Sequence, residues 1–87
     1  MTEANRVYNK SFGGLSYEIL DEEAYERYWW GKASSTREAF EAWLKDPEAT
    51  QSKVARRYGR GPKAIFIHVT KLRRQGILRK FKRARRE

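Results

Sequence analysis

The sequence predicts one small domain that is mainly α-helical with a small β element, built from four helices and a short sheet. Its 87 residues are enough for a single domain with a thin hydrophobic core. Apolar residues recur at helical spacing over most of residues 21–74, and they alternate with polar residues in two short segments. We expect residues 1–14 to be a flexible N-terminus, residues 15–81 to form the domain and residues 82–87 to be a basic tail.

The first predicted strand covers residues 15–19. Apolar and polar residues alternate there after a Gly-Gly turn signal, which places Ser16 and Glu18 on the outer face. A second strand is predicted for residues 77–81. Because an isolated strand is unstable, we expect the two segments to pair in one sheet.

The first two helices are predicted from their capping residues. Asp21 is a suitable N-cap, since two glutamates follow it in the first turn, where the helix dipole favours acidic side chains. Ser35 precedes Glu38 by three residues, which is the spacing of a capping box, so we expect the second helix to begin there. It ends near residues 46–47, before a proline. The apolar faces comprise Tyr25, Tyr28 and Trp29 in the first helix and Ala39, Phe40, Trp43 and Leu44 in the second.

The third and fourth helices form the most regular part of the pattern. One is predicted for residues 51–58 with Thr50 as N-cap. The other begins at Pro62, where the missing N–H costs nothing, and ends at Gly76. A glycine-containing turn joins them, so residues 50–78 are expected to form a helix-turn-helix. The inner faces comprise Val54, Ala55 and Tyr58, followed by Ile65, Val69 and Leu72.

Charge is distributed unevenly along the chain. There are 20 Lys and Arg against 11 Asp and Glu, a net charge of +9. Residues 51–87 hold fourteen of the basic side chains and only Glu87 as an acid, whereas residues 1–50 contain more acids than bases. Such segregation concentrates positive potential on one part of the molecule. It predicts a polyanionic partner, above all nucleic acid.

The spacing of small and apolar residues in the third and fourth helices resembles that of the winged helix-turn-helix superfamily of DNA-binding proteins. The matching positions are Thr50, Gln51, Ala55, Gly59, Ile65, Val69, Leu72, Gly76, Ile77 and Leu78. The resemblance implies a winged helix-turn-helix fold in which residues 62–75 are the recognition helix, lying in the major groove of DNA. It covers about a third of the chain.

Two positions depart from that family pattern. Arg60 stands where a small apolar residue is usual, so we expect a more exposed turn or a phosphate contact there. The wing normally has a return strand, but the residues after Phe81 are nearly all Arg and Lys. We therefore expect a truncated wing, with residues 15–19 as its partner in the sheet.

A helical wheel of residues 62–75 places one face opposite the apolar stripe. This face combines cations, which pair with guanine edges, and small or aliphatic groups, which contact thymine methyls. Two interpretations of Ile67 stay open, contact with a thymine methyl and contact with protein. The predicted base-facing residues are Lys63, Ala64, Ile67, Thr70, Lys71 and Arg74.

The remaining cations are predicted to contact phosphates, which position a protein on DNA without reading its sequence. For those on the third helix, an ordinary solvated helix face is the alternative. The predicted phosphate contacts are Lys53, Arg56, Arg57, Arg60, Arg79, Lys80, Lys82, Arg83, Arg85 and Arg86.

The sequence thus predicts a sequence-preferring double-stranded DNA-binding protein, either a small transcriptional regulator or a replication or partition accessory factor. One alternative is an RNA-binding or ribosome-associated winged-helix protein, although most aromatic residues lie at core spacing in the acidic half rather than beside the cations. Another is a protein-interaction module. A homodimer would suit a palindromic DNA site, and its candidate contacts are Tyr25, Trp29, Trp30 and Trp43.

Catalysis, metals and membranes are not expected. His68 lies beside the apolar stripe and is predicted to be a packed residue, and no glycine segment has the spacing of a phosphate-binding loop. The chain has no cysteine and a single histidine, so we expect no metal site and no cofactor. No apolar run approaches the length of a membrane span or a signal peptide, so we expect a cytoplasmic protein, nucleoid-associated in a prokaryote.

Overall fold

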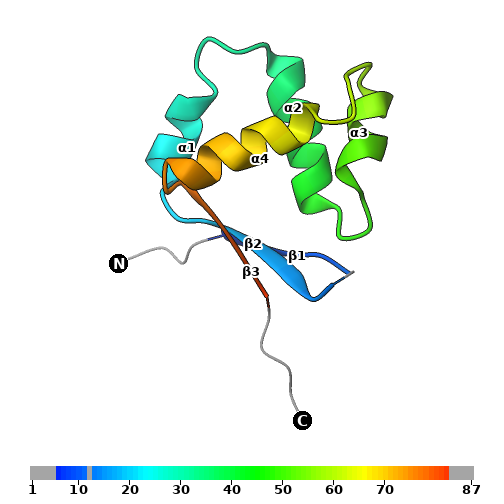
Figure 1. Ribbon diagram of the computed structural model, residues 1–87. Coiled ribbons are helices and arrows are strands. Elements are labelled where there is room, and N and C mark those ends of the chain that lie inside the picture. Colours follow the sequence, from blue (N-terminus) through cyan, green and yellow to red (C-terminus); the bar gives the residue numbers. More distant parts are fainter. Residues whose placement is uncertain (1–5, 12, 83–87) are drawn as a thin grey trace.

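Four helices and a three-stranded sheet make up the structure, in the order β1-β2-α1-α2-α3-α4-β3 (Figure 1). The computed structural model describes residues 6–11 and 13–82. The helices gather on one side of the sheet (Figure 1), and the prediction of four helices with a short sheet is confirmed in this form. The elements are β1 Arg6–Asn9, β2 Leu15–Ile19, α1 Glu22–Tyr28, α2 Ser34–Lys45, α3 Gln51–Arg57, α4 Ala64–Arg74 and β3 Leu78–Lys82.

The sheet is antiparallel, with β2 as its central strand. β2 pairs with β3 in a register that runs from Leu15 opposite Lys82 to Ile19 opposite Leu78. The predicted pairing of residues 15–19 with the strand after Gly76 is therefore confirmed. β1 pairs with the other edge of β2, so the third strand of the sheet comes from the N-terminal side.

The N-terminal segment contains regular structure, so the prediction of flexibility over residues 1–14 is wrong where the structure describes it. Residues Arg6–Asn9 form β1, and all four pair with β2, from Arg6 opposite Ile19 to Asn9 opposite Ser16. Their sequence has no clear apolar period, and the strand forms because β2 offers a second hydrogen-bonding edge. Residues 1–5 of the predicted terminus lie outside the described residues.

Lys10, directly after β1, is buried and joins the hairpin to the end of α2. Its Nζ donates hydrogen bonds to the carbonyl oxygens of Trp43 and of Asp46, the latter at 2.9 Å. These carbonyls lie at the C-terminal end of the helix, where the dipole favours a cation. The same Nζ lies 4.4 Å from the centroid of the Trp43 ring, and burial lowers the pKa of Lys10 to about 8.

Two of the three predicted N-caps are confirmed. Asp21 accepts a hydrogen bond from the backbone N–H of Ala24 at 3.1 Å, and Thr50 accepts one from Lys53 at 3.4 Å. The capping box at Ser35 is wrong, because α2 begins one residue earlier and its N-cap, Ala33, makes no side-chain bond. The Ser35 hydroxyl instead accepts a hydrogen bond from Arg60 Nη2 at 2.6 Å.

The fourth helix is shorter than predicted at its start. α4 begins at Ala64, because Gly61, Pro62 and Lys63 form a separate turn closed by a bond from Ala64 N–H to the Gly61 carbonyl at 3.1 Å. Its end agrees with the prediction. Gly76 has a φ of 74°, and the Ile77 N–H reaches back to the Leu72 carbonyl at 3.0 Å, as in a Schellman motif.

The core lies between the inner face of the sheet and the four helices. It contains nearly all of the predicted apolar faces, including Val54, Ala55, Ile65, Val69 and Leu72. Tyr58 is an exception: it is 37% exposed because α3 ends at Arg57, so Tyr58 does not continue its inner face. Ser16 also differs from its prediction. It lies on the strand face predicted to be outer but is buried, and its hydroxyl donates a hydrogen bond to Asn9 Oδ1 at 2.6 Å.

Ala55→Leu is expected to lower the free energy of unfolding by about 1–3 kcal/mol, because Ala55 is fully buried on α3, which packs on α4. Urea denaturation followed by circular dichroism measures the effect. Ala33→Leu serves as the matched control, since Ala33 is exposed and the same substitution there should change the stability by less than about 0.5 kcal/mol. Equal stabilities for the two variants would contradict the register of the helix pair.

Candidate nucleic-acid interface

The positive charge of the basic half of the chain is not neutralised by acidic side chains in the described part of the folded molecule. Residues 51–82 contain eleven Lys and Arg and no carboxylate side chain. Among the described residues, the only ion pair made by this segment joins Arg79 to Glu18 on β2, at 3.2 Å. The other ion pairs lie on β1, α1 and α2. Positive potential is therefore concentrated on α3, α4 and β3.

The outward face of α4 carries the predicted base-facing residues. Burial of Ile65, Val69 and Leu72 fixes the rotation of the helix about its axis. The opposite side then presents an exposed row of cations around Ile67, which is 48% exposed. Of the predicted set, Lys63, Ile67, Lys71 and Arg74 are exposed, and Ala64 and Thr70 are half-buried. About half of the Ile67 side chain is thus open to a partner, and both interpretations of it stay open.

A second cationic surface lies in a groove of about 360 Å³ between α4 and β3. We call it the basic groove; it is lined by Thr70, Arg73, Arg74, Leu78, Arg79 and Lys80. Arg73 was not among the sequence-predicted residues, because a helical wheel places it on a flank rather than on the outward face. Only the position of β3 beside α4 brings Arg73 and Lys80 into one groove, and the one available signal was the absence of any acid in this segment.

The other predicted phosphate contacts divide into three groups. Exposed cations on α3 and β3 remain open to solvent. Arg60 is half-buried and bonded to Ser35, which ties the turn before α4 to the start of α2, whereas Gly59, Gly61 and Pro62 of the same turn are exposed. Arg83, Arg85 and Arg86 lie outside the described residues. The exposed group comprises Lys53, Arg56, Arg57, Arg79, Lys80 and Lys82.

His68 is half-buried on the flank of α4 that faces α1. Its Nδ1 lies 2.8 Å from Tyr28 Oη in a hydrogen bond, and its ring centroid is 5.3 Å from that of Trp29. Burial, together with the nearby cations Lys71, Lys32 and Arg60, lowers the pKa of His68. The imidazole is therefore predominantly neutral at pH 7 and joins α4 to α1, in agreement with its prediction as a packed residue.

Three of the four predicted homodimer contacts are core residues instead. Tyr25, Trp29 and Trp43 are at most 5% exposed. The sequence pattern could not separate a dimer surface from a core, and the packing of α1 on α2 decided it: the ring centroids of Trp29 and Phe40 lie 5.3 Å apart. Trp30 is 73% exposed and is the one candidate that could meet a second copy.

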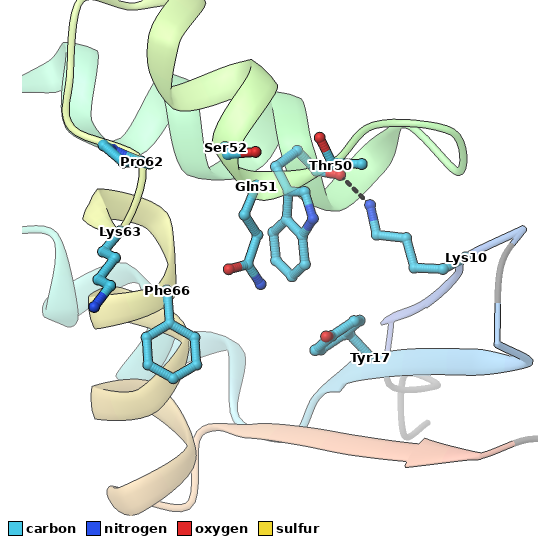
Figure 2. A pocket seen from close by; sticks show the side chains of 9 residues that line it. Lys10, Tyr17, Thr50, Gln51, Ser52, Pro62, Lys63 and Phe66 are labelled. Carbon is cyan, nitrogen blue, oxygen red and sulfur yellow. Dashed lines mark hydrogen bonds between the residues drawn. The ribbon is translucent and has the colours of Figure 1, made fainter.

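An aromatic pocket of about 530 Å³ opens between α3, the start of α4 and the sheet (Figure 2). Its lining includes Tyr17, Trp43, Gln51, Pro62, Lys63 and Phe66. Figure 2 shows side chains from β2, α3 and α4 converging on the same hollow. The sequence alone does not indicate this pocket, because its walls come from segments far apart in the chain.

The described residues contain no group of three His, Asp or Glu that could hold a metal ion. None of the described helices is long and apolar enough to cross a bilayer. Comparisons with protein-family models, with curated proteins and with solved structures found no match for the chain. The resemblance to the winged helix-turn-helix superfamily thus stays a prediction that depends on residues 50–78.

Proposed function

We propose that the protein is a sequence-preferring double-stranded DNA-binding protein that inserts α4 into the major groove. The supporting observation is the continuous cationic surface formed by the outward face of α4 and the basic groove beside it. An α-helix fits the major groove, and flanking cations are then placed to meet the phosphates. The role is one of binding, as a transcriptional regulator or as a replication or partition accessory factor.

The chemistry of the α4 face supports base recognition in addition to phosphate contacts. Arg74 is exposed and can pair with the O6 and N7 of guanine, which is the commonest specific contact in the major groove. Thr70 and Ile67 can contact a thymine methyl. The cations of α3 and β3 then supply affinity that does not depend on sequence.

Arg74→Ala is expected to relax base preference at one or two positions of the bound site, at a cost of about 1–3 kcal/mol for the preferred duplex. Selection of bound duplexes from a random pool, with the wild type and the variant in parallel, measures this and also reports the spacing and symmetry of the site. Titration of the preferred duplex at several salt concentrations completes the test. Absent or salt-insensitive binding would overturn the proposal.

RNA remains a second candidate partner because of one feature of the structure. Phe66 is 54% exposed beside the cations, and exposed aromatic rings stack on the unpaired bases of RNA. Competition between structured RNA and duplex DNA at equal phosphate concentration separates the two candidates. The RNA alternative requires the RNA to displace the duplex.

A further inference from the structure

The aromatic pocket is not used by a helix lying in the major groove, although it adjoins that surface. It shares Lys63 with the predicted base-facing set. Its floor includes Tyr17, whose direct cross-strand partner on β3 is Lys80 of the basic groove. Paired residues of an antiparallel sheet point to the same side. The pocket and the basic groove therefore lie next to each other along the same side of α4.

The walls of the pocket suit a flat aromatic ligand. Phe66 is 54% exposed, although phenylalanine is one of the residues most often buried. Tyr17 and Trp43 form the floor, and their rings meet edge to face with centroids 4.9 Å apart. Figure 2 shows Phe66 and Tyr17 on either side of the hollow.

Polar groups at the rim add the capacity to recognise the edge of a ring. The side chains of Gln51 and Ser52 form no hydrogen bond with other described residues, and both line the pocket. A glutamine amide offers both a donor and an acceptor, which matches the mixed donor and acceptor edge of a nucleobase.

The charged side chains that line the pocket favour a negatively charged ligand. Two cations line it and no acidic side chain does. The Nζ of Lys10 is already bonded to two carbonyl oxygens, so the exposed Lys63 is the lining cation that is available to an anionic group. Known ligand sites of about 300–1,000 Å³ hold small organic molecules, so a volume of about 530 Å³ is sufficient for one nucleotide.

We propose that the aromatic pocket binds one unpaired nucleotide, with its base against Phe66 and Gln51 and its phosphate on Lys63. In a nucleic acid, this nucleotide is a base displaced from the stack, and the neighbouring backbone continues along the basic groove. That form of the proposal rests on the proposed DNA binding. A free mononucleotide has the same chemistry, and the test separates the two sources.

The test compares a perfect duplex with the same duplex carrying a single-nucleotide bulge, by fluorescence anisotropy. The wild type is expected to bind the bulged duplex roughly tenfold more tightly, since stacking of one base on an aromatic ring strengthens binding by roughly 5- to 150-fold. Phe66→Ala should abolish this preference and leave affinity for the perfect duplex unchanged. Trp30→Ala is the matched control, because Trp30 is also an exposed aromatic residue but does not line the pocket.

Titration with adenosine monophosphate, followed by NMR chemical shifts of the amides around Gln51 and Phe66, tests the free nucleotide. Shifts there without binding to either duplex would support the pocket while contradicting the proposed DNA binding. The proposal would be overturned if adenosine monophosphate causes no shifts and the duplex experiment also fails. The duplex experiment fails if the wild type binds the two duplexes equally, or if Phe66→Ala still prefers the bulged duplex. Salt-sensitive binding of the perfect duplex would then leave the proposed function standing.

Discussion

Replacing Arg73 and Lys80 together by glutamine is expected to weaken binding to every duplex by roughly fiftyfold near 0.1 M salt. Both cations line the basic groove, and neither forms an ion pair with the described residues. Each cation that neutralises a phosphate contributes about −0.9 to the slope of log affinity against log salt. The double variant should therefore flatten that slope by roughly two units, without a change in base preference.

Anisotropy titrations at several salt concentrations measure both quantities. The matched control is the double variant Arg27→Gln and Lys45→Gln, which removes the same net charge from α1 and α2. These cations pair with Glu23 and Glu41, at 3.8 and 3.7 Å, and lie away from the basic groove. Screening should make their effect on affinity small. If the two double variants weaken binding equally, net charge rather than the groove determines affinity.

The largest loss of stability is expected from Trp43→Ala, at about 3–5 kcal/mol. Trp43 is 2% exposed and lies where α2 meets the sheet, with ring centroids 4.9 Å from Tyr17 and 5.7 Å from Phe40. Its ring also contacts the Lys10 ammonium, so truncation leaves a cavity beside a buried cation. Since small domains are stable by about 5–15 kcal/mol, the variant should be close to unfolding at 37 °C.

Urea denaturation followed by far-ultraviolet circular dichroism measures this loss without depending on tryptophan fluorescence. Trp30→Ala is the control, because Trp30 is 73% exposed and its removal should change the stability by less than about 0.5 kcal/mol. A similar loss in both variants would mean that Trp30 is covered in solution, as in a homodimer. A stable Trp43→Ala protein would contradict the core described above.

The elements that could be predicted are those whose signals are local. Asp21 and Thr50 satisfy backbone N–H groups three residues away, so their identity alone indicated where α1 and α3 begin. The stripe of Ile65, Val69 and Leu72 follows from helical periodicity, and it also oriented the exposed face of α4. The N-cap prediction at Ser35 is wrong, because the Ser35 hydroxyl accepts a hydrogen bond from the side chain of Arg60, which is distant in the sequence.

The candidate site was only partly predictable, because its grooves join segments that are distant in the chain. Arg73 faces the basic groove since β3 returns beside α4, and Phe66 faces a pocket whose floor comes from β2. A helical wheel describes one helix at a time and places these two residues on its flanks, so it cannot reveal a groove whose other wall is a strand. Burial of the dimer candidates Tyr25 and Trp29 likewise depends on how α1 meets α2, and burial of Trp43 depends on how α2 meets the sheet.

The sequence by itself determined the segregation of charge, the capped helices and the buried stripe of α4, because each depends on residues within a few positions of one another. Only the tertiary structure decided that Arg6–Asn9 would form a strand, that Lys10 would be buried against the carbonyls of α2, and that cations of α4 and β3 would line one groove. These features arise from hydrogen-bonding edges and surfaces that exist only after the chain has folded. The net charge of +9 indicated a polyanion, and the fold supplied the surfaces that could hold it.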